Sequence, residues 1–310
     1  MASESLPGWL HGCIVYSSPY AGPGPAAVFD CSVGDSAAPR RVLLDELVSL
    51  ASRLLGRRLA VAGYEVEDMR RLGYRVNKAM LSGGGEARIV EYLGRLLNAV
   101  LVLPGEAAVE RVEVGSPLHP PVPGSPSGGR EQPLLERPPV YTAEPLVPEH
   151  PGEITVRHSG GEARVALESL LDHLEEVELP LHCVTGWSTL KRWIAAPLAA
   201  LLSAAGAGPP RGWLVAVSTG GYAAVIPASE AREAWLAVGL EGRPLPRRHG
   251  GPVRLVAPSL YGWKHVKWVA RIDVVDDYVD GFWEARGYHE AGRAAAGERF
   301  KVRNPGLLAA

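Results

Sequence analysis

Two segments in the second half of the sequence carry residue types suited to binding a metal ion and a phosphate. The first is Leu181–Ser188 (LHCVTGWS), which contains Cys183. A thiolate is a soft ligand for a transition metal, and an activated thiol is also a nucleophile. Free cysteine is equally one of the residue types most often buried as a small hydrophobic side chain. The residue type alone therefore leaves metal ligation, nucleophilic catalysis and packing open.

The second segment is basic and rich in glycine. It runs through GRPLPRRHGGPVR (Gly242–Arg254) and PSLYGWKHVKW (Pro258–Trp268). Glycines let backbone amides approach a ligand closely, and fixed cations with exposed amides are what a phosphate-bearing ligand needs. A solvated basic face with turn glycines is the structural alternative, and composition alone favours it.

Three further groups have ordinary structural explanations. Ser82–Glu86 (SGGGE) could hold a phosphate at the start of a helix, but it lacks the Lys-Ser/Thr of a P-loop, so a flexible turn is favoured. The spacing of His158, His173 and His182 matches no standard metal-ligand pattern. The acidic run Glu175–Glu178 is interpreted as a solvated helix end rather than an acid–base pair.

Composition excludes several classes of function. The chain has 310 residues, 46% hydrophobic and 21% charged, with a net charge of -2, which gives no reason to expect nucleic acid as a partner. Its three cysteines, Cys13, Cys31 and Cys183, form no CxxC pair and can build neither a disulfide framework nor a four-thiolate iron–sulfur cluster. A second redox centre would therefore have to belong to another molecule.

The sequence also predicts a cytoplasmic protein without a membrane span. The first residues have neither a basic region nor an apolar stretch of the kind that export signals contain. The most apolar run, Trp193–Gly208, is interrupted by Pro197 and at about 16 residues is shorter than the ~20 that cross a bilayer. It is interpreted as a buried helix.

A proline-rich stretch divides the chain. Residues 115–151 contain 11 of the 27 prolines and are predicted to form an extended linker between residues 1–114 and residues 152–310. The first part is predicted to be a small α/β domain, because helical and extended patterns alternate in it. Its expected elements are helices over Val42–Leu55 and Glu86–Asn98 and strands over Leu59–Ala62 and Ala99–Leu103.

The second part is predicted to be β-rich with few helices, which makes the whole chain an α+β protein. Thr219-Gly220-Gly221 is a hairpin turn between two strand patterns. The expected strands are Ile154–His158, Leu214–Ser218, Tyr222–Ile226, Val253–Ala257 and Val266–Val274, with a short helix over Ala166–Val177.

Four motifs in order, HCVTGWS, GRPLPRRHGGPVRLVAP, YGWKHVKW and GFWEARGYH, carry a family resemblance. Over roughly residues 152–300 the chain resembles the molybdopterin domain of the sulfite oxidase family, most of all its haem-free bacterial and archaeal members, among them the catalytic subunit of the methionine-sulfoxide reductase. The resemblance implies a mixed, β-rich molybdopterin-binding domain of sulfite-oxidase type.

The resemblance also implies roles for individual residues. Cys183 matches the single protein thiolate on molybdenum, and Trp187 lies just past it, in the wall of the metal pocket. The positions that match contacts to the pterin and its phosphate are Ser218, Thr219, His249, Arg254, Lys264, His265, Val266 and Lys267.

By the same resemblance, the chain is expected to be a molybdenum–molybdopterin oxidoreductase. The reaction would be a two-electron oxygen-atom transfer on a small substrate, with an external electron-transfer protein or a quinone as redox partner. The cofactor would carry the chemistry, and the protein would supply orientation and electrostatics. A non-catalytic molybdopterin-binding or carrier protein is the alternative.

Two departures from the family pattern argue against sulfite as the preferred substrate. The family's sulfite oxidases have arginines soon after the cysteine, where this chain has Gly186-Trp187-Ser188, and a tyrosine where it has Val238 and Gly239. Without a guanidinium clamp, a sulfite dianion would be held poorly. The flat, uncharged Trp187 would suit a less charged substrate.

The pterin-covering segment that the family carries before the cysteine is also not recognisable. The proline-rich stretch, with His119, Tyr141 and His150, is the candidate to replace it.

Overall fold

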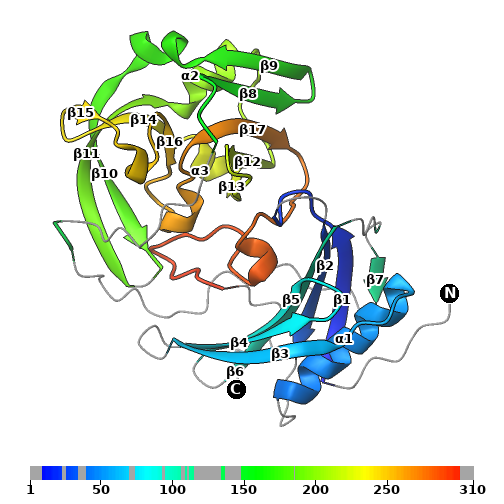
Figure 1. Cartoon of the computed structure of the whole chain (residues 1–310). Coiled ribbons are helices and arrows are strands. Elements are labelled where there is room, and N and C mark those ends of the chain that lie inside the picture. Colours follow the sequence, from blue (N-terminus) through cyan, green and yellow to red (C-terminus); the bar gives the residue numbers. More distant parts are fainter. Residues whose placement is uncertain are drawn as a thin grey trace. The chain divides into compact units, whose positions relative to one another are not determined.

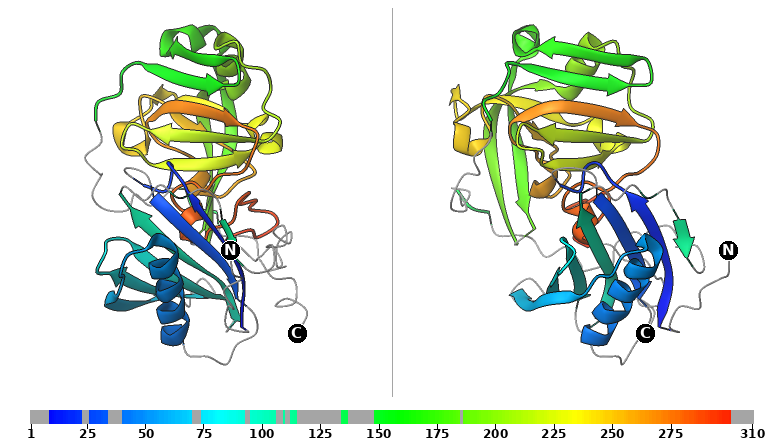
Figure 2. Two further views of the ribbon diagram at one scale, coloured as in Figure 1. Left: turned by 90° about the vertical axis from the view of Figure 1, so that its right-hand side faces the viewer. Right: turned by 45° about the vertical axis from the view of Figure 1, so that its right-hand side comes forward.

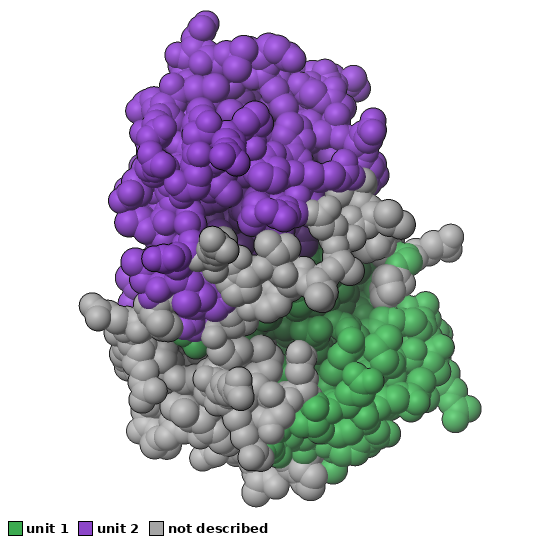
Figure 3. Space-filling view, turned by 60° about the vertical axis from the view of Figure 1, so that its left-hand side comes forward, with its two compact units in different colours: residues 1–127, 282–290, 296–310 green, residues 128–281, 291–295 purple. Residues whose placement is uncertain are grey.

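The computed structural model of the chain forms two compact units, coloured separately in Figure 3. Unit 1 comprises residues 1–127, 282–290 and 296–310, and unit 2 comprises residues 128–281 and 291–295. The structure describes residues 9–22, 26–33, 40–69, 74–92, 95–105, 109, 112–114, 134–136, 148–184 and 186–300. Most of the predicted linker, with His119 and Tyr141, lies outside the described residues, and the domain boundaries drawn from the sequence stay predictions.

Unit 1 is built on an antiparallel sheet with a helix along one face (Figures 1 and 2). In spatial order its strands are β3 (Val61–Met69), β4 (Tyr74–Leu81), β5 (Glu86–Tyr92), β6 (Arg95–Pro104), β2 (Ala26–Val33), β1 (Leu10–Ser17) and β7 (Val112–Val114). The predicted strand Ala99–Leu103 lies inside β6, and the run Leu59–Ala62 leads into β3.

Helix α1 (Arg40–Leu55) confirms the predicted helix over Val42–Leu55. Its apolar residues recur every three to four positions, so they share one face, and Leu43, Leu47 and Leu50 are buried in the core of unit 1. Gly56 follows the helix with a φ of 63°, a left-handed conformation that glycine adopts without a steric penalty.

The predicted helix over Glu86–Asn98 is wrong, because this stretch forms β5 and the start of β6. Its apolar residues are spaced so that they satisfy a two-residue period as well as a helical one, and Ala87 and Ile89 are buried on one side of the sheet. The preceding Ser82–Gly85 is a hairpin turn, with φ values of 80° at Gly84 and 106° at Gly85. The turn interpretation of this glycine-rich stretch therefore holds.

The other face of the unit 1 sheet is covered by a late segment of the chain. The 3₁₀ helix η5 (Glu284–Arg286) places Ala285 in a cluster with Val28, Val100 and Val102. Arg286 Nε lies 3.0 Å from Glu86 Oε1, and its Nη1 donates to the Ala21 carbonyl at 2.7 Å. Part of the GFWEARGYH motif thus packs in unit 1 rather than in unit 2.

One pair of cysteines is joined. Cys13 on β1 and Cys31 on β2 are directly opposite each other in the antiparallel register and form a disulfide, and both are buried. This bridge was not predicted from the sequence, because it depends on the register of two strands. Among the described residues Cys183 is the cysteine that is not in a disulfide.

Unit 2 contains two further sheets (Figures 1 and 2). The first is formed by β10 (Glu175–Cys183), β11 (Trp187–Pro197), β14 (Trp235–Leu240) and β15 (Arg243–Pro244), with β16 (Arg254–Val256) also paired to β14. The second has the order β13 (Ala223–Pro227), β12 (Trp213–Ser218), β17 (Val269–Val275), β8 (Glu153–His158) and β9 (Gly161–Ala166), in which only β17 and β8 run parallel. The predicted β-rich class is confirmed.

The predicted hairpin around Thr219-Gly220-Gly221 is present between β12 and β13, and Gly221 has a φ of 81°. The predicted strands Ile154–His158, Val253–Ala257 and Val266–Val274 correspond to β8, β16 and β17. Apolar residues of both sheets form one core with the short helix α2 (Leu198–Ala204).

Two helices expected in unit 2 are replaced at least in part by strands. The stretch Ala166–Val177 contains the 3₁₀ helix η2 (Leu167–His173) and then enters β10, so Glu175–Glu178 lies on a strand and not at a helix end. The apolar run Trp193–Gly208 is strand β11 up to Pro197, and only then helix α2. None of the helices in the described part of the chain is long and apolar enough to cross a membrane.

Candidate functional site

The hairpin of β10 and β11 positions Cys183. Cys183 is the last residue of β10 and stands opposite Trp187, the first residue of β11. Gly186 closes the turn with a φ of 95° and donates its N–H to the Cys183 carbonyl at 3.0 Å. Both Cys183 and Trp187 are half-buried, so the thiol is neither packed away nor fully in solvent.

The register of the hairpin decides which side chains share a face with Cys183. Alternate residues of a strand point the same way, so Trp187, Thr189 and Trp193 of β11 lie on the face of Cys183. The Arg254 guanidinium carbon lies 5.4 Å from the centre of the Trp193 ring. The Arg254 side chain therefore contacts the same face of the hairpin as Cys183. Trp187, opposite Cys183, and Trp193, under Arg254, are six positions apart, or about 20 Å along the strand.

His182 points to the opposite face, as strand alternation requires. Its Nδ1 is hydrogen-bonded to Ser188 Oγ at 2.8 Å, directly across the hairpin. Burial lowers the pKa of His182, which favours the neutral imidazole near neutral pH. The His182–Ser188 hydrogen bond therefore joins the two strands on the face opposite Cys183.

The segment that contains YGWKHVKW meets β10 beside the cysteine. His182 and Tyr261 form an isolated parallel bridge. A Cβ at Gly262 would lie 3.3 Å from the His182 carbonyl oxygen and 3.4 Å from Leu181 Cδ2, so this contact leaves little room for a side chain. The structure therefore brings this loop next to the end of the Cys183 strand.

Within this loop, Lys264, His265 and Val266 are buried. Lys264 Nζ donates to the Val225 carbonyl at 2.6 Å, so the ammonium is held inside unit 2. His265 Nε2 is 2.8 Å from the Ala257 carbonyl, and burial, with a smaller effect of the Arg254 charge, lowers the His265 pKa to about 3. His265 is thus neutral over the physiological pH range.

Arg254 joins the two basic segments. Its Nη1 donates to the His249 carbonyl at 2.8 Å and its Nη2 to the His265 carbonyl at 3.4 Å. Burial lowers its pKa to about 10, so the guanidinium stays charged at neutral pH. Lys267 Nζ donates to the Arg248 carbonyl at 2.7 Å, so both cations support the backbone of the 3₁₀ helix η3 (Arg247–His249).

The turn after β12 reaches the same region. Thr219 donates its N–H to the Trp268 carbonyl at 2.9 Å, and Trp268 donates its own N–H to the Gly250 carbonyl at 3.1 Å. Ser218 Oγ accepts a hydrogen bond from the Tyr222 N–H at 3.0 Å. Ser218 ends β12 and Arg254 begins β16, and the other predicted cofactor-binding residues lie in adjoining segments of unit 2. Hydrogen bonds link these segments.

Three buried polar atoms in these loops have no hydrogen-bond partner in the described part of the chain. They are Arg254 Nε, Thr219 Oγ1 and His265 Nδ1. Each buried atom left unsatisfied costs about 1–3 kcal/mol. A pterin and its phosphate present both acceptors and donors, so these residues fit such a ligand, with Arg254 as the charged group and Lys264 as internal support for the loop.

Two residues near the site were not singled out from the sequence. Trp193 carries the Arg254 contact, and Thr189, on the face of Cys183, is buried with an Oγ1 that also has no partner among the described residues. Strand periodicity would have placed both residues on the face of Cys183. This would have required a prediction that Glu175–Cys183 is a strand and pairs with the strand that contains Thr189 and Trp193.

Comparison with known proteins shows the family of the chain. Residues 153–283 match the family model described as "Oxidoreductase molybdopterin binding domain". The uncharacterized oxidoreductase YuiH of Bacillus subtilis is 30% identical over 177 residues, which cover 52% of this chain and 88% of YuiH. The chain belongs to this family of molybdopterin-binding oxidoreductases.

Two other relatives are matched over a smaller part of their own length than YuiH is. The protein-methionine-sulfoxide reductase catalytic subunit MsrP of Pseudomonas syringae is 33% identical over 43% of this chain and 46% of its own length. The mitochondrial sulfite oxidase of Rattus norvegicus is 33% identical over 46% of this chain and 27% of its own length. The chain thus spans less than half of either protein.

The resemblance to the sulfite oxidase family is confirmed, and so is the prediction of a molybdopterin-dependent oxidoreductase of this class. The matched region contains the Cys183 hairpin and all the predicted cofactor-binding residues. Residues 9–105 of unit 1 lie outside it.

Proposed function

We propose that the chain binds molybdenum–molybdopterin with Cys183 as the protein ligand to the metal and transfers an oxygen atom, with two electrons, to or from a small substrate. The observation that carries this proposal is a half-buried cysteine, not in a disulfide, on the hairpin face that the buried arginine Arg254 contacts. Bound there, the cofactor would supply the redox chemistry. An external electron-transfer protein or a quinone would exchange electrons with it.

The residues of the chain would hold and orient the cofactor. Arg254 Nε and Thr219 Oγ1 have no partner among the described residues and can donate hydrogen bonds to a phosphate. His265 Nδ1 would accept a hydrogen bond, because Nε2 carries the proton that is donated to the backbone carbonyls of Ala257 and Leu260. Lys264 and Lys267 would keep the loop in place, since their ammonium groups donate to backbone carbonyls. Val266 would do so as a buried side chain. His249 contributes its carbonyl to the Arg254 contact.

The surroundings of Cys183 favour a substrate less charged than sulfite. The nearest residues on its hairpin face are Trp187, Leu181 and Thr189, none of them a cation. Lys191, the next residue on that face of β11, donates its ammonium to the Glu136 carbonyl. A Cβ at Gly239 would lie 2.8 Å from Ile194, so no tyrosine side chain could be placed there without moving β11. A sulfoxide or another neutral oxygen donor or acceptor suits this pocket better than a dianion.

Metal analysis of a cysteine variant tests the proposal. The chain would be made in a molybdenum-replete host, and Cys183→Ser should lose molybdenum while circular dichroism shows that it stays folded. Val184→Ser is the matched control, because it introduces the same side chain at the next residue, in the turn after β10, and it should retain the metal. Unchanged molybdenum in Cys183→Ser, or wild-type protein without molybdenum and pterin, would overturn ligation by Cys183.

A further inference from the structure

The outer edge of β11, on the side away from β10, is only partly covered. β14 pairs with β11 from Trp193 onward. Nearer the hairpin end, the Leu135 N–H donates to the Ser188 carbonyl at 2.7 Å. Between these two contacts, Glu241 binds both backbone groups of Arg192, donating its N–H to the carbonyl at 2.8 Å and accepting from the N–H through Oε1 at 3.4 Å.

Leu190 lies midway between the two covered positions. Backbone groups of alternate strand residues face the same edge, so its N–H and C=O point outward as those of Ser188 and Arg192 do. Across the hairpin stands Pro180, which has no N–H. In the part of the chain that the structure describes, neither backbone group of Leu190 has a hydrogen-bond partner. One donor–acceptor pair is therefore open between two occupied ones.

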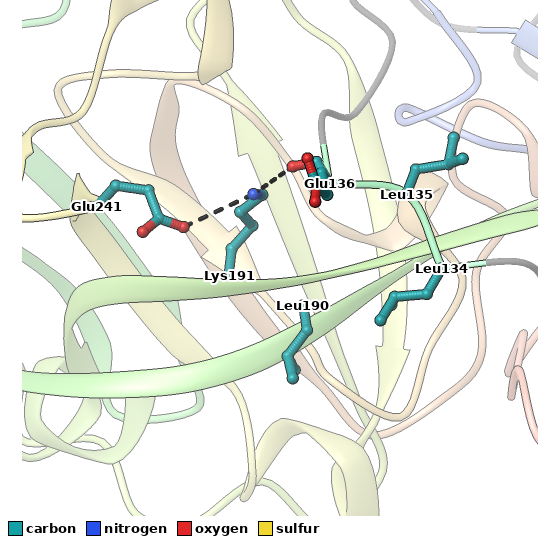
Figure 4. A pocket seen from close by; sticks show the side chains of 6 residues that line it. All are labelled: Leu134, Leu135, Glu136, Leu190, Lys191 and Glu241. Carbon is teal, nitrogen blue, oxygen red and sulfur yellow. Dashed lines mark hydrogen bonds and ion pairs between the residues drawn. The ribbon is translucent and has the colours of Figure 1, made fainter.

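A groove with a volume of about 460 Å³ lies at this opening (Figure 4). Its lining residues are Leu134, Leu135, Glu136, Leu190, Lys191 and Glu241. Leu134 is 68% exposed and Leu190 is 42% exposed, and the two side chains point to the same side of the strand in Figure 4. They give the groove an apolar surface that remains open to solvent.

The positive and negative charges around the groove differ in whether they already have a partner. Lys191 Nζ donates to the Glu136 carbonyl and lies 3.7 Å from Glu241 Oε1, so its positive charge is already engaged. The Glu136 side chain is exposed, and its carboxylate forms no ion pair within the part of the chain that the structure describes. The charge left for an incoming ligand is negative.

We propose that this groove binds an extended peptide segment of a partner protein, which adds a strand at Leu190. The open N–H and C=O call for another extended backbone, as in other cases of strand addition at a sheet edge. The distance from Ser188 to Arg192 is about 13 Å, enough for a segment of four residues. An aliphatic side chain would pack on Leu134 and Leu190, and a lysine or arginine would lie beside Glu136.

This proposal is independent of the proposed function, because none of the groove residues is assigned to the cofactor. The test uses the full chain and a fluorescein-labelled peptide, acetyl-Lys-Leu-Lys-Leu-Lys-amide, in which apolar and basic side chains alternate. Fluorescence anisotropy should show saturable binding. Hydrogen exchange of the Leu190 amide should slow at least tenfold when the peptide is added. The same peptide with every backbone amide methylated should not bind, because it cannot donate to the Leu190 carbonyl.

Leu190→Asp should weaken peptide binding at least tenfold, and Leu171→Asp should change it less than twofold. Leu171 is the matched control, since it is a leucine 60% exposed on η2 and does not line the groove. If the melting temperature shows that Leu190→Asp is unfolded, Leu190→Ala replaces it, with an expected loss of at least threefold.

Three outcomes would overturn the proposal. The first is no binding of the unmethylated peptide at millimolar concentration. The second is an equal loss of binding in Leu171→Asp. The third is a dimer of the full chain in light scattering that Leu190→Asp dissociates, which would make a second copy of the chain the occupant of the groove.

Discussion

The Arg254 guanidinium lies over the ring of Trp193, with 5.4 Å between the guanidinium carbon and the ring centre, and it is buried there. Its two terminal nitrogens donate to the carbonyls of His249 and His265. One side chain thus connects the strand that follows the Cys183 turn to both basic loops. The charge is retained in a buried position because the planar fork of arginine matches two acceptors at once.

Replacement of Arg254 should therefore destabilise the protein. In Arg254→Met the two carbonyls lose a charged donor and stay buried, which should cost about 3 kcal/mol in the free energy of unfolding. Urea denaturation followed by tryptophan fluorescence measures this loss. Arg157→Met is the control, because the Arg157 side chain is 52% exposed, and its effect should stay within about 0.5 kcal/mol. Equal effects of the two changes would contradict a structural role for the Arg254 fork.

His265 should make the protein sensitive to acid. Its pKa is lowered to about 3 in the folded state, mainly by burial, whereas an unfolded histidine titrates near 6.5. The unfolded chain then binds a proton that the folded chain does not, so stability is lost as the pH falls below about 6.5, by up to ~1.4 kcal/mol per pH unit until about pH 3.

The measurement is the free energy of unfolding between pH 7 and pH 5, where few carboxyl groups titrate. His265→Gln keeps an N–H donor for the Ala257 carbonyl but has no titrating group, so its stability should fall less steeply with decreasing pH than that of the wild type. Parallel pH profiles for the two proteins would show that His265 is not the group responsible.

The sequence predicted the site segments better than the positions of their side chains. The motif order singled out the segments of Arg254 and Lys264, and the Arg254 side chain donates hydrogen bonds to the backbone on both sides of it, at His249 and His265. The sequence could not show that the Lys264 ammonium turns inward to the Val225 carbonyl. The direction of a side chain in a 3₁₀ turn depends on the strands packed around it, and residue spacing does not report those.

The errors in secondary structure have a common physical cause. Short apolar runs such as that around Ile89 fit both helical and strand periods, and pairing with distant strands decides between them. Strand β10 begins with three glutamates within four residues, a composition with low strand propensity, and it is a strand because β11 pairs with its whole length. The helix α1 was predictable because it is long and strongly periodic.

The Cys13–Cys31 disulfide should contribute to the stability of unit 1. It closes a loop with a sequence separation of 18, for which the loss of chain entropy in the unfolded state corresponds to roughly 3 kcal/mol. The double variant Cys13→Ser/Cys31→Ser should unfold at lower denaturant concentration by that amount. Mass spectrometry after alkylation without reductant should find one modified thiol in the wild type, that of Cys183.

Three modified thiols would show that the bridge is not formed in the cells from which the protein is isolated. The result also bears on location. Disulfides are rare in cytosolic proteins, apart from those of hyperthermophiles, so an oxidised pair would weigh against the expectation of an ordinary cytoplasmic protein.

Gly251 should be the least replaceable glycine of the HGGPVR segment. A Cβ at this position would lie 2.0 Å from the Leu245 carbonyl oxygen, and this neighbour is backbone, which cannot turn aside as a side chain can. Gly251→Ala should therefore shift the loop that supports His249 and lower the free energy of unfolding by about 1–3 kcal/mol.

Gly208→Ala is the matched control, since nothing lies within 4 Å of a Cβ there. That change should be neutral or stabilising by up to ~1 kcal/mol, because alanine restricts the unfolded chain. Thermal unfolding of both variants beside the wild type separates the two effects. If Gly251→Ala and Gly208→Ala have the same melting temperature, the loop has space to move. The close approach of Gly251 to Leu245 would then not be what keeps the His249 carbonyl within reach of Arg254.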